Sequence, residues 1–169
     1  MPDHWSVKDA LSSYLNENGF TVEEYDADVV RVTFWGITFP VPNPPQRKIA
    51  VRFHDLHHIM TGFGTDPTGE GEISAWELRR GVGVFGFYVR CIVFFGAVMG
   101  CLHSPRRTLK AWRAARSSLG LRPATMAGYL ELLELTVGDL RAMYDVSSHG
   151  IAGAHKLHYD VPSVENQST

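Results

Sequence analysis

Cysteine is scarce in this sequence, whose 169 residues include only Cys91 and Cys101. Two cysteines form neither a disulfide framework nor a cysteine-rich zinc ribbon, so both of those domain classes are excluded. Because the two lie ten positions apart in an apolar stretch, we expect buried thiols in a reducing compartment. The N-terminal residues resemble neither a secretory signal nor an Arg-rich transit peptide. These features predict a cytoplasmic protein, with peripheral contact to a membrane as the alternative.

A strong excess of one charge is also absent. Sixteen Lys and Arg residues against eighteen Asp and Glu residues give a net charge of -2, so we expect no nucleic-acid partner. The charges are nevertheless unevenly distributed along the chain. No acidic residue lies between Glu77 and Glu131, whereas nine Lys or Arg residues do. This basic middle region is therefore a candidate contact for an anionic partner.

The overall composition is that of a globular protein. The chain is 44% hydrophobic and 20% charged, which is too apolar for a disordered chain and ordinary for one folded domain. We predict a single domain over 1–169, with an N-terminal part (1–45), a helical core (46–145) and a polar C-terminal tail (146–169). The predicted fold class is mainly α, a helical bundle with a small β-hairpin-like element near the N-terminus.

Hydrophobic periodicity and the positions of Gly and Pro place the individual elements. An S-x-x-D pair at Ser6 and Asp9 opens the first helix, and Gly19 ends it. The proline-rich run from Pro40 to Pro45 can be neither helix nor central strand, so we expect a rigid link there. The predicted helices are 6–18, 46–61, about 69–101 with glycine interruptions, 105–119 and about 124–144, and the predicted short strands are 30–34 and 37–39.

A long apolar run without charge is also missing. The nearest case extends from Val82 to Leu102, but Arg90 lies near its centre, which costs roughly 2.5–3.5 kcal/mol in a membrane-spanning helix. We expect this segment to be the buried central helix of the bundle. As an alternative, it forms the wall of an apolar ligand site, where Arg90 holds an anionic group and Tyr88 is a second substrate-binding candidate.

The clearest chemical signal is a cluster of polar residues on one predicted helix. His54 and His58 are four positions apart, so their imidazoles share a helix face, and Asp55 lies about 100° from His54. Two imidazoles and a carboxylate are ligands for a divalent ion such as Zn, Fe or Mn, of which we expect Zn. Further carboxylates, Glu70 and Glu72, begin the next predicted helix after a short glycine-containing turn.

The segment HDLHH, followed by eleven residues and Glu70, has the pattern H-D-x-x-H-x11-E. This pattern resembles the metal-binding signature of the coenzyme Q (ubiquinone) biosynthesis protein 4 family, and TGFGTDPTGE resembles that family's turn into a G-E helix. The resemblance covers 46–144 and is strong only over 53–77. It implies that a bacterial member of the family binds its metal through four ligands, His54, Asp55, His58 and Glu70.

Through this resemblance we expect a metal-dependent enzyme of the lyase or oxidoreductase type. Its substrate would be a quinone-like, isoprenoid or other aromatic intermediate, decarboxylated and hydroxylated at C1 of the ring. His57 and Glu72 are outside the signature and are the candidates for moving a proton, that is, for catalysis. The link containing PVPNPP is not part of the signature, which leaves room for a different task in secondary metabolism.

Other classes of protein compete with this interpretation. In the first alternative, the protein is a non-catalytic lipid- or isoprenoid-binding scaffold of quinone biosynthesis, and the metal is structural. An HD-type phosphohydrolase also uses an adjacent His and Asp, but it needs a further upstream His, and only His4 is available. The sequence leaves the native metal and the oligomeric state open, and a homo-oligomer is one alternative.

Two further groups of residues carry weaker signals. Arg106, Lys110 and Arg113 share one face of a predicted helix, either as a solvated face or as a contact for an anionic membrane or substrate. The second group lies in the C-terminal tail, which either stays polar and loose or closes over the metal cleft and supplies an acid or base. Its members are His149, His155, His158, Tyr159 and Asp160.

Overall fold

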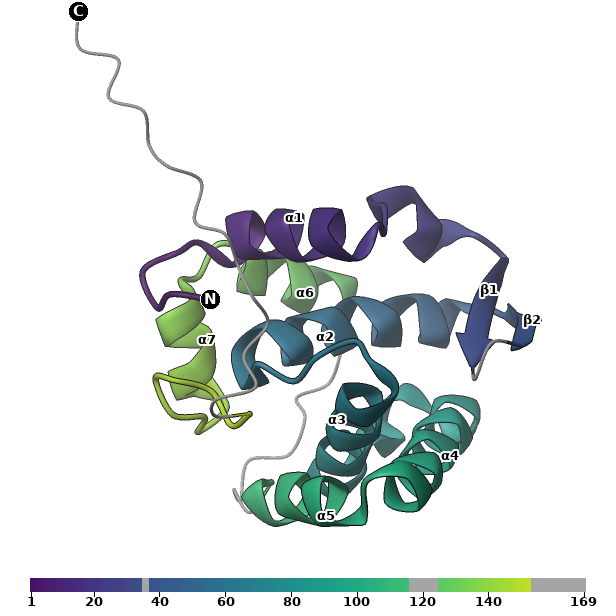
Figure 1. The fold of residues 1–169 in the computed structure, drawn as a ribbon. Coiled ribbons are helices and arrows are strands. Elements are labelled where there is room, and N and C mark those ends of the chain that lie inside the picture. Colours follow the sequence, from purple (N-terminus) through teal and green to yellow (C-terminus); the bar gives the residue numbers. More distant parts are fainter. Residues whose placement is uncertain (35–36, 116–124, 153–169) are drawn as a thin grey trace, which may run out of the picture.

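The computed structural model describes residues 1–34, 37–115 and 125–152 of the chain, and over these residues the fold is mainly α with one small antiparallel sheet (Figure 1). This agrees with the predicted fold class. Helix α2 lies in the middle, α1, α6 and α7 pack around it, and α3, α4 and α5 form a second group beside it. The helices are α1 (Val7–Asn18), α2 (Pro45–Thr61), α3 (Pro67–Arg80), α4 (Phe87–His103), α5 (Pro105–Ala114), α6 (Met126–Leu133) and α7 (Val137–Met143), with 3-10 turns η1 (Val22–Asp26) and η2 (Val82–Phe85).

The first helix and the hairpin follow the sequence signals closely. Ser6 caps α1 by accepting a hydrogen bond from the Asp9 backbone N–H, and Gly19 ends the helix at a φ of 69°. Strands β1 (Val29–Phe34) and β2 (Ile37–Pro42) then pair in antiparallel register. The predicted proline link is shorter than expected: Pro40 and Pro42 lie in β2, and Pro45 is the first residue of α2. A two-stranded sheet has only edge strands, which tolerate Pro, and Pro fits the first turn of a helix.

The predicted interrupted helix from 69 to 101 is wrong, because the chain folds there into two separate helices. Gly81 and Gly86 both adopt left-handed backbone φ angles, 97° and 91°, and they separate α3, η2 and α4. Helix α4 then packs closely against α3. A Cβ atom on Gly71 would collide with the Cα atom of Gly100, so glycine at both positions permits this approach.

The predicted helix from 124 to 144 is likewise two helices. Helix α6 ends at Leu133, and Thr136 caps the start of α7 through a capping box with Asp139. Arg141 on α7 reaches the carboxyl end of α2, where Nε donates to the carbonyl of Met60 at 3.0 Å. Residue 124, the predicted helix end at 119–120 and the tail beyond 152 lie outside the described residues.

Helix α4 is a surface helix rather than the buried centre of the bundle. Its buried residues form one narrow line, whereas Phe87, Phe94 and Leu102 are 83%, 58% and 70% exposed. The prediction of buried thiols is also wrong: both cysteines are on this helix and both are exposed. Apolar residues occupy both the covered and the exposed sides of α4, so an apolar neighbourhood in the sequence does not indicate burial on this helix. Within the described residues, none of the helices is long and apolar enough to cross a membrane.

Candidate metal centre

The candidate site lies where the carboxyl-terminal half of α2 meets the first turn of α3. Helix α2 ends at Gly62, whose φ of 76° turns the chain back, and Asp66 then caps α3 by accepting from the Gly69 backbone N–H. This short connection places Glu70 opposite His54 and His58. The local folding signals in TGFGTDPTG therefore position Glu70 beside the two histidines.

The three side chains direct their free atoms at a common point. His54 Nε2 and His58 Nε2 are 3.1 Å apart. Glu70 places Oε2 at 3.4 Å from His54 Nε2 and Oε1 at 3.5 Å from His58 Nε2. Ligand atoms bonded to one zinc ion at about 2.0–2.1 Å are separated from each other by about 3.0–3.4 Å. The two histidine nitrogens are at this spacing, and Glu70 directs a different oxygen at each of them, so a shared ion would fit after a small movement of the carboxylate.

The hydrogen bonds of the two Nδ1 atoms determine which ring nitrogens of His54 and His58 are free to bind an ion. His58 Nδ1 lies 3.0 Å from the carbonyl oxygen of Phe63, and His54 Nδ1 lies 3.0 Å from Oε1 of Glu77. A carbonyl and an ionised carboxylate can only accept, so both Nδ1 atoms carry the hydrogen and donate it. Both Nε2 atoms then present lone pairs to each other and to Glu70. Two lone pairs and a carboxylate that face one another repel unless a proton, a metal ion or another hydrogen-bond donor lies between them.

The charges of the cluster agree with this. Burial opposes the charged form of His54, but the nearby Glu77 and Glu70 carboxylates outweigh it and raise its pKa well above 6.5. Burial would also raise the pKa of Glu70, yet the two histidines lower it to about 2. The pKa of Glu77 is lowered as well, against its burial, by His54 and His57. The site therefore holds two carboxylates that stay ionised and attract a cation.

Asp55, the remaining predicted ligand, is engaged elsewhere. Its carboxylate accepts a short hydrogen bond from the hydroxyl of Tyr25, and the hydroxyl of Tyr14 lies 3.4 Å away. Burial raises the pKa of Asp55, despite the opposing effect of the nearby histidines. The group of converging ligand atoms consists of His54, His58 and Glu70. Coordination by Asp55 stays a prediction that would require its carboxylate to turn from Tyr25 towards the ion.

Glu72, one of the two predicted catalytic residues, faces away from this cluster. It forms a bidentate ion pair with Arg107 of α5, with N–O distances of 3.0 and 2.7 Å. Residues two apart on an α-helix point about 200° apart, so Glu70 and Glu72 cannot share a face. The carboxylate that does share the face is Glu77, seven residues after Glu70, which the sequence analysis missed. The i, i+7 spacing was the available signal.

His57, the other catalytic candidate, lies behind the cluster rather than in it. The side chain is 2% exposed, and Nδ1 donates to the same Glu77 oxygen at 2.6 Å. Burial lowers the pKa of His57 in spite of that carboxylate. Its ring packs against Trp76 and Tyr144, and Nε2 has no hydrogen-bond partner among the described residues. His57 is thus a neutral, buried donor to Glu77.

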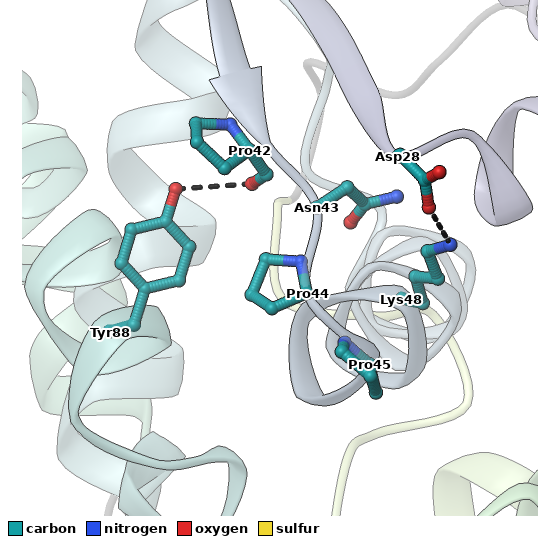
Figure 2. A pocket seen from close by; sticks show the side chains of 7 residues that line it. All are labelled: Asp28, Pro42, Asn43, Pro44, Pro45, Lys48 and Tyr88. Atoms are coloured by element: carbon teal, nitrogen blue, oxygen red, sulfur yellow. Dashed lines mark hydrogen bonds and ion pairs between the residues drawn. The ribbon is translucent and has the colours of Figure 1, made fainter.

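The predicted substrate contacts are on α4. Arg90 is exposed. The Tyr88 hydroxyl donates to the carbonyl of Pro42 at 3.1 Å and lines an open pocket of about 420 Å³ beside Lys48 (Figure 2). Lys48 precedes His58 by ten residues, which is about 15 Å along α2. This pocket is therefore separate from the candidate metal centre, and a substrate role for Arg90 and Tyr88 stays a prediction.

The predicted tail contacts are mostly beyond the described part of the chain. His149 is exposed, whereas His155, His158, Tyr159 and Asp160 lie outside the described residues. Just before them, the backbone N–H groups of Ile151 and Ala152 donate to the Thr61 carbonyl at the end of α2. The chain therefore leaves the described fold beside the carboxyl end of the helix that carries His54 and His58.

Comparison with known proteins gives no assignment: no family model, curated protein or solved structure matches this chain. The resemblance to the coenzyme Q biosynthesis protein 4 family therefore rests on the H-D-x-x-H-x11-E motif and the adjacent TGFGTDPTGE turn alone.

Proposed function

We propose that the protein is a metal-dependent enzyme whose divalent ion is bound by His54, His58 and Glu70. One observation carries the proposal: two histidine Nε2 lone pairs and a carboxylate converge, while both Nδ1 atoms are already hydrogen-bonded. Metal-binding histidines commonly donate their second ring N–H to a carboxylate or a backbone carbonyl. Both histidines do so here, one to Glu77 and the other to Phe63.

The unequal exposure of the three side chains supports a catalytic over a purely structural ion. His58 is fully buried, but the side chains of His54 and Glu70 are 25% and 41% exposed. Structural zinc sites are usually closed by four protein ligands, whereas catalytic sites keep a position for water or substrate. Three ligands with one accessible side fit the catalytic class. A bound ion would polarise a carbonyl or carboxylate oxygen of the substrate.

The substrate class comes from the motif resemblance. A quinone-like or other aromatic ring carrying a carboxylate would place its acid group on the ion, and an isoprenoid tail would extend over apolar surface. The proposed reaction breaks the bond between the ring and the carboxylate, releases CO2 and forms a ring C–OH bond with the oxygen of water, while molecular oxygen takes up the two electrons and becomes hydrogen peroxide. Such a step belongs to quinone biosynthesis or to secondary metabolism. The alternative is a scaffold protein that carries such a lipid and uses its ion structurally.

Metal analysis of the purified protein tests the metal proposal. We expect about one divalent ion per chain in the wild type and a loss of that ion in Glu70→Gln, which removes one charged ligand from a half-exposed position. Glu72→Gln is the matched control, because it lies on the same helix and faces Arg107. Wild-type protein that binds no divalent ion at any occupancy would contradict the proposal.

Turnover separates the enzyme from the scaffold. The assay supplies a carboxylated quinone precursor with molecular oxygen and follows product by mass spectrometry. A folded His58→Ala variant that has lost turnover supports the enzyme. Wild-type protein that retains the precursor unchanged but unfolds on metal removal supports the scaffold.

A second feature favours contact with an anionic membrane. Helix α4 carries a continuous exposed apolar face, which we call the α4 face: Phe87, Cys91, Phe94, Phe95, Val98, Cys101 and Leu102. Arg90 lies at its edge, and α5 follows directly with exposed Arg106, Lys110 and Arg113 beside the half-exposed Leu109 and Trp112. With no acidic residue from 78 to 130, this region attracts anionic headgroups. Two copies meeting through it would instead bring their own cations together.

Sedimentation with vesicles tests this contact. We expect binding to vesicles that contain phosphatidylglycerol, weaker binding to pure phosphatidylcholine, and a loss of binding in Phe94→Glu. Ile37→Glu is the control, because Ile37 is 68% exposed on the hairpin rather than on α4. The result would be different if the α4 face joined two copies of the chain. The wild type would then bind neither kind of vesicle and would form a dimer that Phe94→Glu dissociates.

A further inference from the structure

Behind the candidate metal centre, one carboxylate joins two of the histidines. Oε1 of Glu77 accepts from His54 Nδ1 at 3.0 Å and from His57 Nδ1 at 2.6 Å. Glu77 lies on α3, whereas both histidines lie on α2, so this oxygen connects the two helices that build the site. Its side chain is only 4% exposed.

We propose that Glu77 is a positioning residue for the metal centre, an inference that rests on the proposed metal binding by His54. Glu77 would act through His54, holding the imidazole in the form with hydrogen on Nδ1 and the lone pair on Nε2. It would also make that Nε2 a stronger donor, because a carboxylate on the second ring nitrogen raises the basicity of a metal-bound imidazole.

His57 holds Glu77 in this place. A carboxylate buried at 4% exposure is stable only when it is fully hydrogen-bonded. His57 supplies the shorter of its two hydrogen bonds and packs its ring against Trp76 and Tyr144. The aromatic packing restricts the His57 ring, the ring restricts Glu77, and Glu77 restricts His54. This series of contacts gives the buried His57–Glu77 pair a role in positioning His54.

The two histidine ligands are thus oriented in different ways. His58 is oriented by the backbone carbonyl of Phe63, which no substitution of a side chain can remove. His54 depends on a side chain, and it is the more exposed of the two. Substitution of Glu77 should therefore weaken the metal site through His54 alone and leave His58 in place.

The test measures zinc affinity by competition with a chromophoric chelator in the wild type, Glu77→Gln, Glu77→Ala and Glu72→Gln. Loss of a hydrogen-bond partner behind a metal ligand typically weakens metal binding about 10–100-fold. We expect Glu77→Gln near the lower end, because the amide oxygen can still accept, and Glu77→Ala near the upper end. Glu72→Gln, with a side chain 5% exposed on the same helix, should bind zinc as the wild type does. Thermal unfolding of each variant identifies losses caused by misfolding.

Nitrogen-15 NMR of histidine-labelled, zinc-loaded wild-type protein supplies a readout that needs no variant. We expect His54 with zinc on Nε2 and a protonated, hydrogen-bonded Nδ1. Zinc on Nδ1 of His54, or folded Glu77 variants with wild-type zinc affinity, would overturn the role of Glu77 while leaving the proposed metal binding intact. A wild type that binds no zinc would instead contradict the proposed function itself.

Discussion

Helices α2 and α4 are both 17 residues long, but they differ in the kind of side chain that they bury. Helix α2 buries polar side chains, namely Arg47, Arg52, Asp55, His57 and His58. Helix α4 exposes large apolar ones, with Phe87 at 83% and Leu102 at 70%. Both departures cost stability in an ordinary globular protein. We infer that each marks a surface kept for a ligand: an ion between α2 and α3, and a lipid surface on α4.

We expect the largest effect, on both metal binding and stability, from a substitution on α2. We expect His58→Ala to weaken metal binding at least about 100-fold, since it removes a ligand and not only the group behind one. The same change removes a fully buried ring, so we expect a loss of about 2–4 kcal/mol in the free energy of unfolding, the range for large-to-small core changes. Metal analysis and denaturant unfolding measure the two effects. Retained metal in a folded variant would contradict the ligand role of His58.

On α4 the same kind of test should change binding without changing stability. We expect Phe94→Glu to alter the free energy of unfolding by no more than about 0.5 kcal/mol, because the ring is 58% exposed. Leu56→Glu on α2, where Leu56 is 1% exposed, should prevent folding. Urea titration compares the two variants. A large destabilisation by Phe94→Glu would mean that the α4 face is covered within the folded chain.

Proton and metal compete at the site, which makes metal stabilisation depend on pH. The pKa of His54 is raised in the metal-free fold above its unfolded value of about 6.5, so its protonation stabilises the fold below pH 6.5. That contribution is lost as pH rises through the raised pKa. We therefore expect metal-free protein to lose stability above pH 6.5, and added zinc to raise Tm more at pH 8 than at pH 6. A zinc effect that shrinks with rising pH would contradict this account.

Acid should act on the site through a different group. The pKa of Glu70 is about 2 in the fold against 4.5 for the free side chain, so its stabilising charge is present above pH 4.5 and is lost towards pH 2. We expect Glu70→Gln to flatten the acid limb of the stability profile of metal-free protein. Unfolding midpoints between pH 2 and 5 measure this, with Glu72→Gln as the comparison.

The last prediction concerns the hydrogen bond that holds Asp55. Tyr25→Phe removes the hydroxyl that donates to this buried carboxylate, at a cost of about 1–3 kcal/mol. If Asp55 is a fourth metal ligand, the released carboxylate should make zinc binding tighter. Unchanged zinc affinity together with the loss of stability would indicate that Asp55 only anchors η1 to α2. Chelator competition and thermal unfolding of the same sample distinguish these outcomes.

The fold class and the three converging side chains, His54, His58 and Glu70, were predictable from the sequence because their signals are local. The Ser6 cap, the terminating glycines and the i, i+4 histidines act within one or two turns of chain. The sequence also predicted that Glu70, 16 positions after His54, lies close to it, because only one short turn joins the two helices. The sequence predicted α3 and α4 as one helix, and α6 and α7 as another, because the apolar periodicity continues across both breaks.

What the sequence could not reveal depends on packing between distant segments. Arg107 lies 35 positions after Glu72, and their ion pair turns Glu72 away from the candidate metal centre. Tyr25 precedes Asp55 by 30 positions, and its hydrogen bond decides where that carboxylate points. The exposure of α4 is of the same kind, because which part of an all-round apolar helix is covered depends on α3.

Anomalous diffraction from a crystal of the zinc-loaded protein locates the ion itself. We expect one ion at about 2.0–2.2 Å from Nε2 of His54, from Nε2 of His58 and from a carboxylate oxygen of Glu70. We also expect Glu77 to accept a hydrogen bond from His54 Nδ1 in that crystal. An ion bound elsewhere on the chain, with His54 and His58 linked only by a shared proton, would show that these three side chains are not a metal site.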